Sequence, residues 1–176
     1  MKHAAMCFAI ACLPLLHGSP VAGPANSPSE RTPLRLTLEM PHPRYRLGEP
    51  ISCKIVLTNA SRSDIRVLRK FLLEDHYLRL EILDARRQRV PFLGPEIKIR
   101  PDLAWVVVLR PAETIIETVP LFGSTETECE QRGVYDLTRE GKYRATAVYS
   151  VCRSCGTGDS WEGEVRSNEV LFEIAR

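Results

Sequence analysis

Apolar and polar residues alternate over most of the chain after residue 33. An alternation with a period of two places successive side chains on opposite faces of a β-strand, so that one face is buried and the other is solvated. The pattern is clearest at 34–40 and 51–59, where the apolar positions are Leu34, Leu36, Leu38 and Met40, followed by Ile51, Cys53, Ile55 and Leu57. Further short strands are predicted at 65–68, 77–83, 89–93, 104–109, 115–121, 143–151 and 169–174.

The turns between these segments and the lack of helical periodicity indicate the fold class. No segment keeps a 3.6-residue apolar period between capping residues, although 71–83 begins with a pattern that fits one helical turn. Many short strands with frequent turn signals are typical of an all-β sandwich or barrel. We therefore predict an immunoglobulin-like Greek-key β-sandwich of about eight strands over residues 34–176. Pro91 places the 89–93 strand at an edge, because proline cannot donate to a sheet ladder.

A tyrosine follows a glycine turn at the start of the strand predicted at 143–151. Gly141 precedes Tyr143 by two residues. In Greek-key sandwiches a tyrosine in this position forms a tyrosine corner, in which the hydroxyl bonds to backbone a few residues upstream. We assign this structural role to Tyr143. Ala145 stands where antibody domains have a cysteine, so the antibody-type disulfide is not expected.

The first 25 residues have the order of a secretory signal peptide. One lysine precedes an apolar run at 4–16, which is shorter than the ~20 residues that cross a bilayer, and small residues and prolines follow. We place cleavage after Ala25, with Ala22 as the alternative, and expect a secreted or periplasmic protein with a disordered lead-in at 26–33. Lipidation at Cys12 would instead anchor the protein to a membrane, but its motif lacks the usual leucine.

The charge of the chain excludes some partners. One of its 24 Lys and Arg residues lies in the signal segment, which leaves 23 against 22 Asp and Glu. Both signs are interspersed, so the composition indicates no basic surface for nucleic acid or an anionic membrane. No later segment is apolar for long enough to form a transmembrane span. The remaining expectation is a protein partner.

Four cysteines follow the signal segment: Cys53, Cys129, Cys152 and Cys155. An even number in an exported chain favours two disulfides, and we predict that Cys53 pairs with Cys152 or Cys155. The last two form a C-x-x-C motif, which raises the alternatives of a zinc site or a redox centre. A zinc site usually needs a second such pair, and no βαβ pattern surrounds the motif, so both alternatives rank below the disulfides.

The sequence has no catalytic signature, and we expect no enzyme activity, no metal and no cofactor. There is no G-x-S-x-G and no H-E-x-x-H motif. The histidines after the signal are His42 and His76, and neither falls in a catalytic pattern. Glu126, Glu128 and Glu130 carry the oxygens that calcium prefers, but not in the spacing of a calcium loop, so a solvated loop is the simpler interpretation.

The connection between the last two predicted strands is the best candidate for recognition. It runs through the C-x-x-C pair and contains Arg153, Asp159 and Trp161. Loops at the end of a rigid sandwich carry binding in many proteins, and tryptophan is enriched at hot spots. The competing interpretation, which ranks first, is that Trp161 packs on the sheet. A basic turn at 86–89 and a glycosylation sequon at Asn59 are common surface features and carry less weight.

Four motifs resemble a known module: YRLGEPI at 45–51 with LTN at 57–59, LRPAET at 109–114, YDLTREGKY at 135–143 and SNEVLFEI at 167–174. Together they resemble the β-sandwich that precedes the catalytic domain of peptidyl-Lys-type metalloendopeptidases, and related secreted bacterial modules. In outline they are also similar to small bacterial proteinase-inhibitor sandwiches. The resemblance runs from about Leu34 to Ile174 and implies the fold. The family's metal site lies in a domain that this sequence does not contain, so its chemistry does not transfer.

These observations predict an exported, non-catalytic β-sandwich module that binds a protein through a loop or an edge strand. The alternative, which rests on the resemblance, is a proteinase inhibitor or a pro-region-like regulator of an exported protease. A protruding, disulfide-braced loop that fits a protease cleft is the feature that distinguishes the alternative from the first hypothesis.

Overall fold

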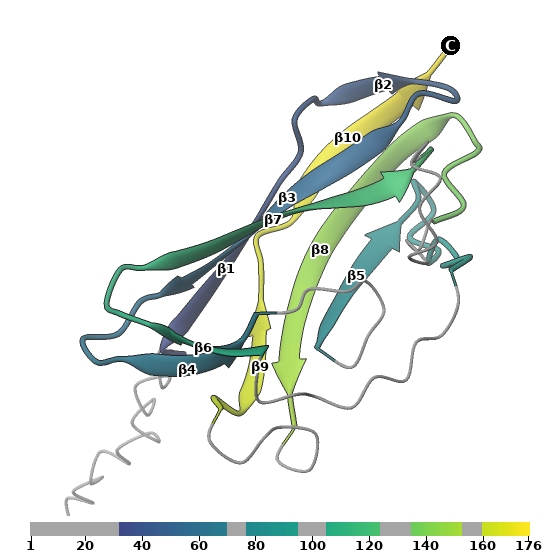
Figure 1. Cartoon of the computed structure of the whole chain (residues 1–176). Coiled ribbons are helices and arrows are strands. Elements are labelled where there is room, and N and C mark those ends of the chain that lie inside the picture. Colours follow the sequence, from purple (N-terminus) through teal and green to yellow (C-terminus); the bar gives the residue numbers. More distant parts are fainter. Residues whose placement is uncertain (1–31, 70–76, 95–104, 124–134, 153–159) are drawn as a thin grey trace, which may run out of the picture. The chain divides into compact units, whose positions relative to one another are not determined.

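The computed structural model describes residues 32–69, 77–94, 105–123, 135–152 and 160–176. The chain divides into two units, Met1–Arg31 and Thr32–Arg176, and every described residue belongs to the second. The described residues form ten β-strands (Figure 1). The signal peptide and the helical turn expected from residue 71 fall outside the described residues and stay predictions.

Sheet A has three antiparallel strands in the order β1 (Leu34–Glu39), β3 (Ile51–Asn59) and β7 (Thr114–Phe122). The alternation in the sequence places the apolar row of β1 and β3 in the core: Leu34, Leu36, Leu38, Ile51, Cys53, Ile55 and Leu57 are all buried. The carbonyl of Pro33 accepts a hydrogen bond from the N–H of Ala60 at 2.8 Å. Pro33, the last residue of the predicted lead-in, is therefore bound to the turn that follows β3.

Sheet B has the order β2 (Arg44–Arg46), β10 (Val170–Ala175), β8 (Gly141–Val151) and β5 (Leu78–Leu83), and β9 (Gly163–Arg166) pairs with β8 beyond β10. β2 runs parallel to β10, whereas β5, β9 and β10 are antiparallel to β8. The chain therefore leaves sheet A after β1 and joins sheet B at β2. This change of sheet occurs in the proline-containing turn at 41–43.

A two-stranded sheet C consists of β4 (Ile65–Leu68) and β6 (Val106–Leu109), which are antiparallel. It continues the β3–β7 pair, because each strand of that pair is joined to a strand of sheet C by a short turn. Buried side chains of all three sheets form one hydrophobic cluster. The prediction of an all-β sandwich is confirmed, and its Greek-key connectivity stays a prediction.

The strand predicted at 89–93 is not formed. Its residues make two isolated bridges, Leu83 with Arg89 and Phe92 with Tyr135, and the N–H of Asp136 donates to the carbonyl of Pro91 at 2.9 Å. Proline explains the outcome, since it interrupts the donors that a ladder needs. The short strands β2 and β9 were not predicted, because their sequences, RYR and GEVR, each contain a single large apolar residue and so show no alternation.

Tyr143 has the geometry predicted for a tyrosine corner. Its hydroxyl donates a hydrogen bond to the carbonyl of Arg139 at 2.7 Å, four residues upstream. The ring stacks on Phe172 of β10 with centroids 5.4 Å apart, and burial is the main cause of the raised pKa of the hydroxyl. Tyr143 therefore fixes the entry of the chain into β8.

Candidate functional site

The predicted binding loop lies only partly within the described residues. Arg153 and Asp159 fall outside them, so their roles stay predictions. Trp161 is half-buried and stacks on Tyr149 of β8 with ring centroids 5.8 Å apart. A Cβ atom at Gly163 would lie 2.8 Å from Cζ2 of Trp161, so the glycine makes room for the indole. These contacts support the packing interpretation of Trp161.

Tyr149 and Trp161 join β4 to sheet B. The Leu68 N–H donates to the Tyr149 hydroxyl at 3.1 Å, and that hydroxyl donates to the Leu68 carbonyl at 3.1 Å. The backbone N–H of Trp161 donates to the backbone carbonyl of Arg66 at 2.6 Å. Burial raises the pKa of Tyr149 far above its ordinary value. Arg66 and Leu68 therefore direct their backbone groups away from β6 and toward sheet B.

The cysteines do not pair as predicted. Cys53 is a free thiol, completely buried on the core side of β3, and burial raises the pKa of this thiol to about 12. The prediction that it pairs with Cys152 or Cys155 is therefore wrong in this structure. The position of Cys53 in the apolar row of β3 explains the result, since it packs there like a small hydrophobic residue. Cys152 is disulfide-bonded, while Cys129 and Cys155 lie outside the described residues.

Other candidates from the sequence are structural or lie outside the described ranges. His76 and the three glutamates at 126–130 are among the latter. The ring of His42 packs edge-on against Tyr45. The basic turn at 86–89 is exposed, and the carboxylate of Asp84 accepts the N–H groups of Arg86 and Gln88 at 2.8 Å each. Within the described part of the chain, no three His, Cys, Asp or Glu side chains gather closely enough to hold a metal ion.

Asn59 is completely buried, although it begins a glycosylation sequon. Its Nδ2 donates to the carbonyls of Ser63 and Leu109 at 2.7 and 2.8 Å. Its Oδ1 accepts from the N–H and the hydroxyl of Ser61 at 2.9 and 2.8 Å. These four bonds occupy the full hydrogen-bonding capacity of the amide. Asn59 therefore holds the turn after β3 against the end of β6.

Arginine and glutamate side chains form a closed ring on the outer face of sheet B. Arg79 pairs with Glu81 at 3.6 Å and with Glu164 at 3.2 Å, and Arg166 pairs with Glu164 at 3.5 Å and also with Glu81. Val148 of β8 lies between Arg79 and Arg166 in the strand register and has no exposed surface. The stems of the charged side chains therefore cover an apolar residue on the solvent face, as long charged side chains do.

Most sheet edges in the described structure are blocked by specific contacts. An edge strand presents unpaired N–H and C=O groups on which another chain can add a strand, unless it is covered or interrupted. At the β1 edge, the Leu38 N–H donates to Oδ1 of Asn168, and Nδ2 of Asn168 donates to the Leu38 carbonyl, both at 3.0 Å. The side-chain amide of Asn168 thus replaces a neighbouring strand at this position.

The two outer edges of sheet B are covered in a similar way. On β5, the Leu80 carbonyl accepts from the Tyr135 hydroxyl at 3.2 Å, and the Ile82 carbonyl accepts from the Val90 N–H at 2.8 Å. On β2, the carboxylate of Glu49 accepts the N–H of Arg46 at 2.7 Å. Loop groups therefore occupy positions that an added strand would need.

The β7 edge is interrupted rather than covered. Glu117 lies opposite the buried Ile55 and is exposed, so a charged residue interrupts the apolar row of Ile115 and Val119 on this edge strand. Pro120, opposite Ser52, has no N–H to offer, and the register shifts between Ile51 and Ser52. Charged residues, proline and bulges are features by which natural edge strands resist pairing.

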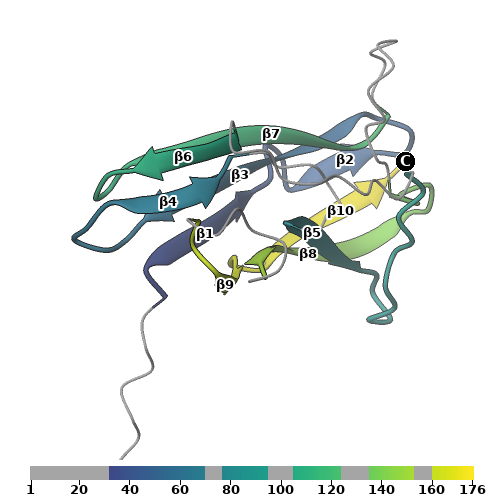
Figure 2. The same cartoon turned by 60° about the horizontal axis from the view of Figure 1, so that its bottom comes forward.

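The β6 edge lacks such features. In an antiparallel pair, residues opposite each other either exchange two hydrogen bonds or direct their backbone groups outward. The backbone groups of Arg66 and Leu68 point away from β6. Val108 lies opposite Arg66 and Val106 lies opposite Leu68, so the N–H and C=O groups of both valines point to the free edge. No hydrogen bond joins these groups to another residue in the described structure, and Val108 is 48% exposed. Figure 2 shows β6 at the border of the unit with β4 on one side.

The composition of β6 makes its edge suitable for pairing. The run Trp105-Val106-Val107-Val108-Leu109 contains only apolar residues, four of them of high β-propensity, and no charge, proline or glycine. The sequence predicted this strand but not its position at an edge, because the partners of a strand depend on the topology. We define the free side of Val106–Leu109 as the β6 edge, and it is the candidate functional site.

Comparisons with known proteins give no family for this chain. No protein-family model and no curated protein matches it. Among solved structures it is similar to one titled "AvmM Catalyzes Macrocyclization in Alchivemycin A Biosynthesis", with a TM-score of 0.43 and 12% identity over 82% of this chain and 89% of that chain.

It is also similar to the Salmonella enterica SafA pilin in complex with the SafB chaperone, with a TM-score of 0.29 and 11% identity over 79% of this chain and 52% of that one. At TM-scores below 0.5, neither structure informs the function of this chain. The resemblance to the metalloendopeptidase module stays a prediction. The described residues include no helix long and apolar enough to cross a membrane.

Proposed function

We propose that this chain is an exported, non-catalytic β-sandwich module that binds a protein partner by adding an extended segment of that partner to the β6 edge. One observation carries the proposal: in the described structure, β6 presents free backbone groups and an apolar sequence, whereas the edges of β1, β2, β5 and β7 are covered or interrupted. Peptide recognition by strand addition uses this kind of edge.

The available contacts suit a specific but moderate interaction. The two N–H and two C=O groups of Val106 and Val108 can form hydrogen bonds, each contributing about 0.5–1.5 kcal/mol net. Covering the exposed half of the Val108 side chain adds roughly 1 kcal/mol. The entropy lost on ordering the added segment offsets part of this gain, so affinities in the micromolar range are expected.

Selection of random nonapeptides displayed on phage against the purified protein tests the proposal. We expect the bound peptides to share an alternation of apolar and polar residues, because a strand presents alternate side chains to one face. Val108→Pro removes the outward N–H of β6 without removing a bond to β4, and we expect it to weaken binding at least about tenfold. Val108→Lys, which places a charge at the edge, is the second variant if proline perturbs folding.

Ile116→Pro is the matched control on the β7 edge. The Asn59 N–H donates to the Glu113 carbonyl, so the alternation of the ladder directs the backbone groups of Ile116 outward, and its side chain is 55% exposed. Binding that survives Ile116→Pro and is lost in both Val108 variants supports the β6 edge. Equal binding by all four proteins, or recovery of no peptide, contradicts it.

The proteinase-inhibitor alternative depends on the loop between β8 and β9. Residues 153–159 of that loop lie outside the described residues, so the alternative stays a prediction. Export likewise stays a prediction from the first 25 residues.

A further inference from the structure

The charges around the β6 edge have one dominant sign. Among the described residues of sheet C and its flanking turns, four exposed arginines, Arg62, Arg66, Arg69 and Arg110, stand against two acids, Asp64 and Glu113. Glu113 is already engaged, since its carboxylate accepts the N–H of Arg110 at 2.8 Å. Electrostatic complementarity across an interface fixes partner choice and register, so this imbalance bears on the chemistry of the segment that β6 binds.

Two of these arginines lie level with opposite ends of β6, Arg69 on the β4 side and Arg110 in the chain that continues β6. The Arg69 N–H donates to the carbonyl of Trp105 at 2.8 Å, which places Arg69 beside the start of β6. Arg110 directly follows Leu109, where β6 ends. Arg69 faces Trp105, and Trp105 and Arg110 are five residues apart. With a strand rise of about 3.4 Å per residue, this separation is about 17 Å. Arg62 lies in the turn that Asn59 ties to Leu109, so it adds charge at the Arg110 end.

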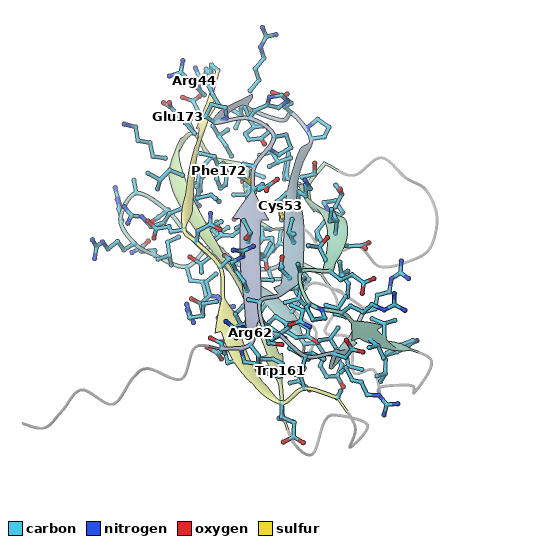
Figure 3. The ribbon with its side chains drawn as sticks, turned by 90° about the vertical axis from the view of Figure 1, so that its left-hand side faces the viewer. Arg44, Cys53, Arg62, Trp161, Phe172 and Glu173 are labelled. Carbon is cyan, nitrogen blue, oxygen red and sulfur yellow. The ribbon has the colours of Figure 1, made fainter. Side chains whose placement is uncertain are left out.

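These charges differ from those on the outer face of sheet B. There, Arg79 and Arg166 each pair with two glutamates in a closed ring. In the described structure no ion pair holds Arg62, Arg69 or Arg110. Figure 3 shows Arg62 and Trp161 toward one end of the unit and the Arg44–Glu173 pair at the other. In the described structure, Arg62, Arg69 and Arg110 therefore leave a positive potential around the β6 edge.

We infer that the segment bound at the β6 edge is an extended peptide of a protein partner with an acidic residue at each end of a short apolar stretch, the two acids being about five residues apart. This inference rests on the proposed function, because it concerns the ligand of the same edge. A second copy of the chain fits less well, since antiparallel pairing of two β6 edges brings Arg69 of one copy toward Arg110 of the other, and the like charges repel. A neutral extended peptide would form the backbone hydrogen bonds to Val106 and Val108 but no ion pairs with Arg69 and Arg110, so it would bind less tightly than an acidic one.

Three synthetic peptides separate the charge effect from strand addition: SEVTVTES, its neutral form SQVTVTQS and its basic form SKVTVTKS. Fluorescence anisotropy with the full chain, at low salt and at about 0.5 M NaCl, gives the dissociation constants. We expect the acidic peptide to bind about three- to tenfold more tightly than the neutral one at low salt. The advantage should disappear at about 0.5 M NaCl, because exposed charges are screened.

Arg69→Gln and Arg110→Gln should each reduce the acidic preference by about twofold. Arg86→Gln, at an exposed arginine of the 84–88 turn in the other sheet, is the matched control and should leave it unchanged. If all three peptides bind equally and Val108→Pro abolishes this binding, the inference of an acidic ligand is wrong, but strand addition at the β6 edge is supported. Failure of every peptide to bind, or binding that Val108→Pro does not alter, overturns both.

Discussion

The side-chain amide of Asn168 forms two hydrogen bonds with the backbone of Leu38, one in each direction and both 3.0 Å long. Asn168 precedes β10 of sheet B, and Leu38 belongs to β1 of sheet A, so the amide joins the two sheets as well as covering an edge. An asparagine side chain can do this because it carries a donor and an acceptor in the same arrangement as a peptide group.

Asn168→Ala should lower the free energy of unfolding by about 1–2 kcal/mol, since it leaves both backbone groups of Leu38 without a protein partner. Urea unfolding followed by tryptophan fluorescence measures the change. A loss below about 0.3 kcal/mol would show that water replaces the amide at no cost, and that the contact does not hold the sheets together.

Ala112→Gly should stabilise the protein by roughly 0.5 kcal/mol. Ala112 is the third residue of the turn 110–113, which the bond from the Glu113 N–H to the Arg110 carbonyl closes at 3.0 Å, and its φ of 64° is unfavourable for a residue with a Cβ. Relief of that strain, about 1–2 kcal/mol, exceeds the entropy that glycine adds to the unfolded chain, about 0.4–1 kcal/mol.

Ala60→Gly is the control for this turn, because Ala60 is also exposed but does not have a positive φ. It should destabilise the protein by about 0.5 kcal/mol, since only the entropy term remains. Thermal unfolding of both variants gives the comparison, and a destabilised Ala112→Gly variant would refute the strain argument.

The buried thiol of Cys53 should make stability fall at high pH. Its pKa is raised from 9.0 to about 12 by burial, so the folded protein keeps the proton while the unfolded chain loses it. The contribution is fully present below pH 9 and is lost as the pH rises through about 12. Between pH 9 and 10.5 the free energy of unfolding should decrease by about 2 kcal/mol from this group.

Cys53→Ala isolates that effect from the other groups that titrate at high pH. The destabilisation of this variant relative to wild type should shrink between pH 8 and pH 10.5, and a constant difference would contradict the buried, free thiol. Intact mass after iodoacetamide treatment checks the same point. Cys53 should react only once the protein is unfolded.

The ring of Arg79, Glu81, Glu164 and Arg166 on sheet B should contribute modestly to the free energy of unfolding, and this contribution should decrease as the salt concentration rises. Hydrogen bonding by Arg166 is the main cause of the lowered pKa of Glu81, so the stability it provides is present above the ordinary pKa of a glutamate and is lost as the pH falls through the lowered value. A double-mutant cycle of Glu81→Gln and Arg166→Gln should give a coupling of about 0.5–1 kcal/mol at low salt, because both side chains are partly exposed. No coupling, or one that persists in about 1 M NaCl, would contradict this account.

Local features explain which parts of the structure were predictable. The inward rows of β1 and β3 follow from alternation alone, and Tyr143 was assignable because its corner involves residues four apart. The free state of Cys53 was not assignable, because a buried thiol and a half-cystine occupy the same kind of position in a strand pattern. The β6 edge depends on which strands meet, a property of contacts between residues far apart in sequence.

The burial of Asn59 has a consequence for how the protein can be made. Both hydrogens on its amide nitrogen are held by backbone carbonyls inside the fold, yet Asn59-Ala60-Ser61 is a sequence that glycosylating hosts modify on nascent chains. A sugar attached there before folding would replace one of the two hydrogens and would not fit at a completely buried position, so Asn59 could no longer join Ser63 to Leu109. In such a host, the yield of folded protein therefore depends on whether the turn after β3 folds before the glycosyltransferase modifies Asn59. Expression in a cytoplasm or periplasm without that transferase avoids the modification.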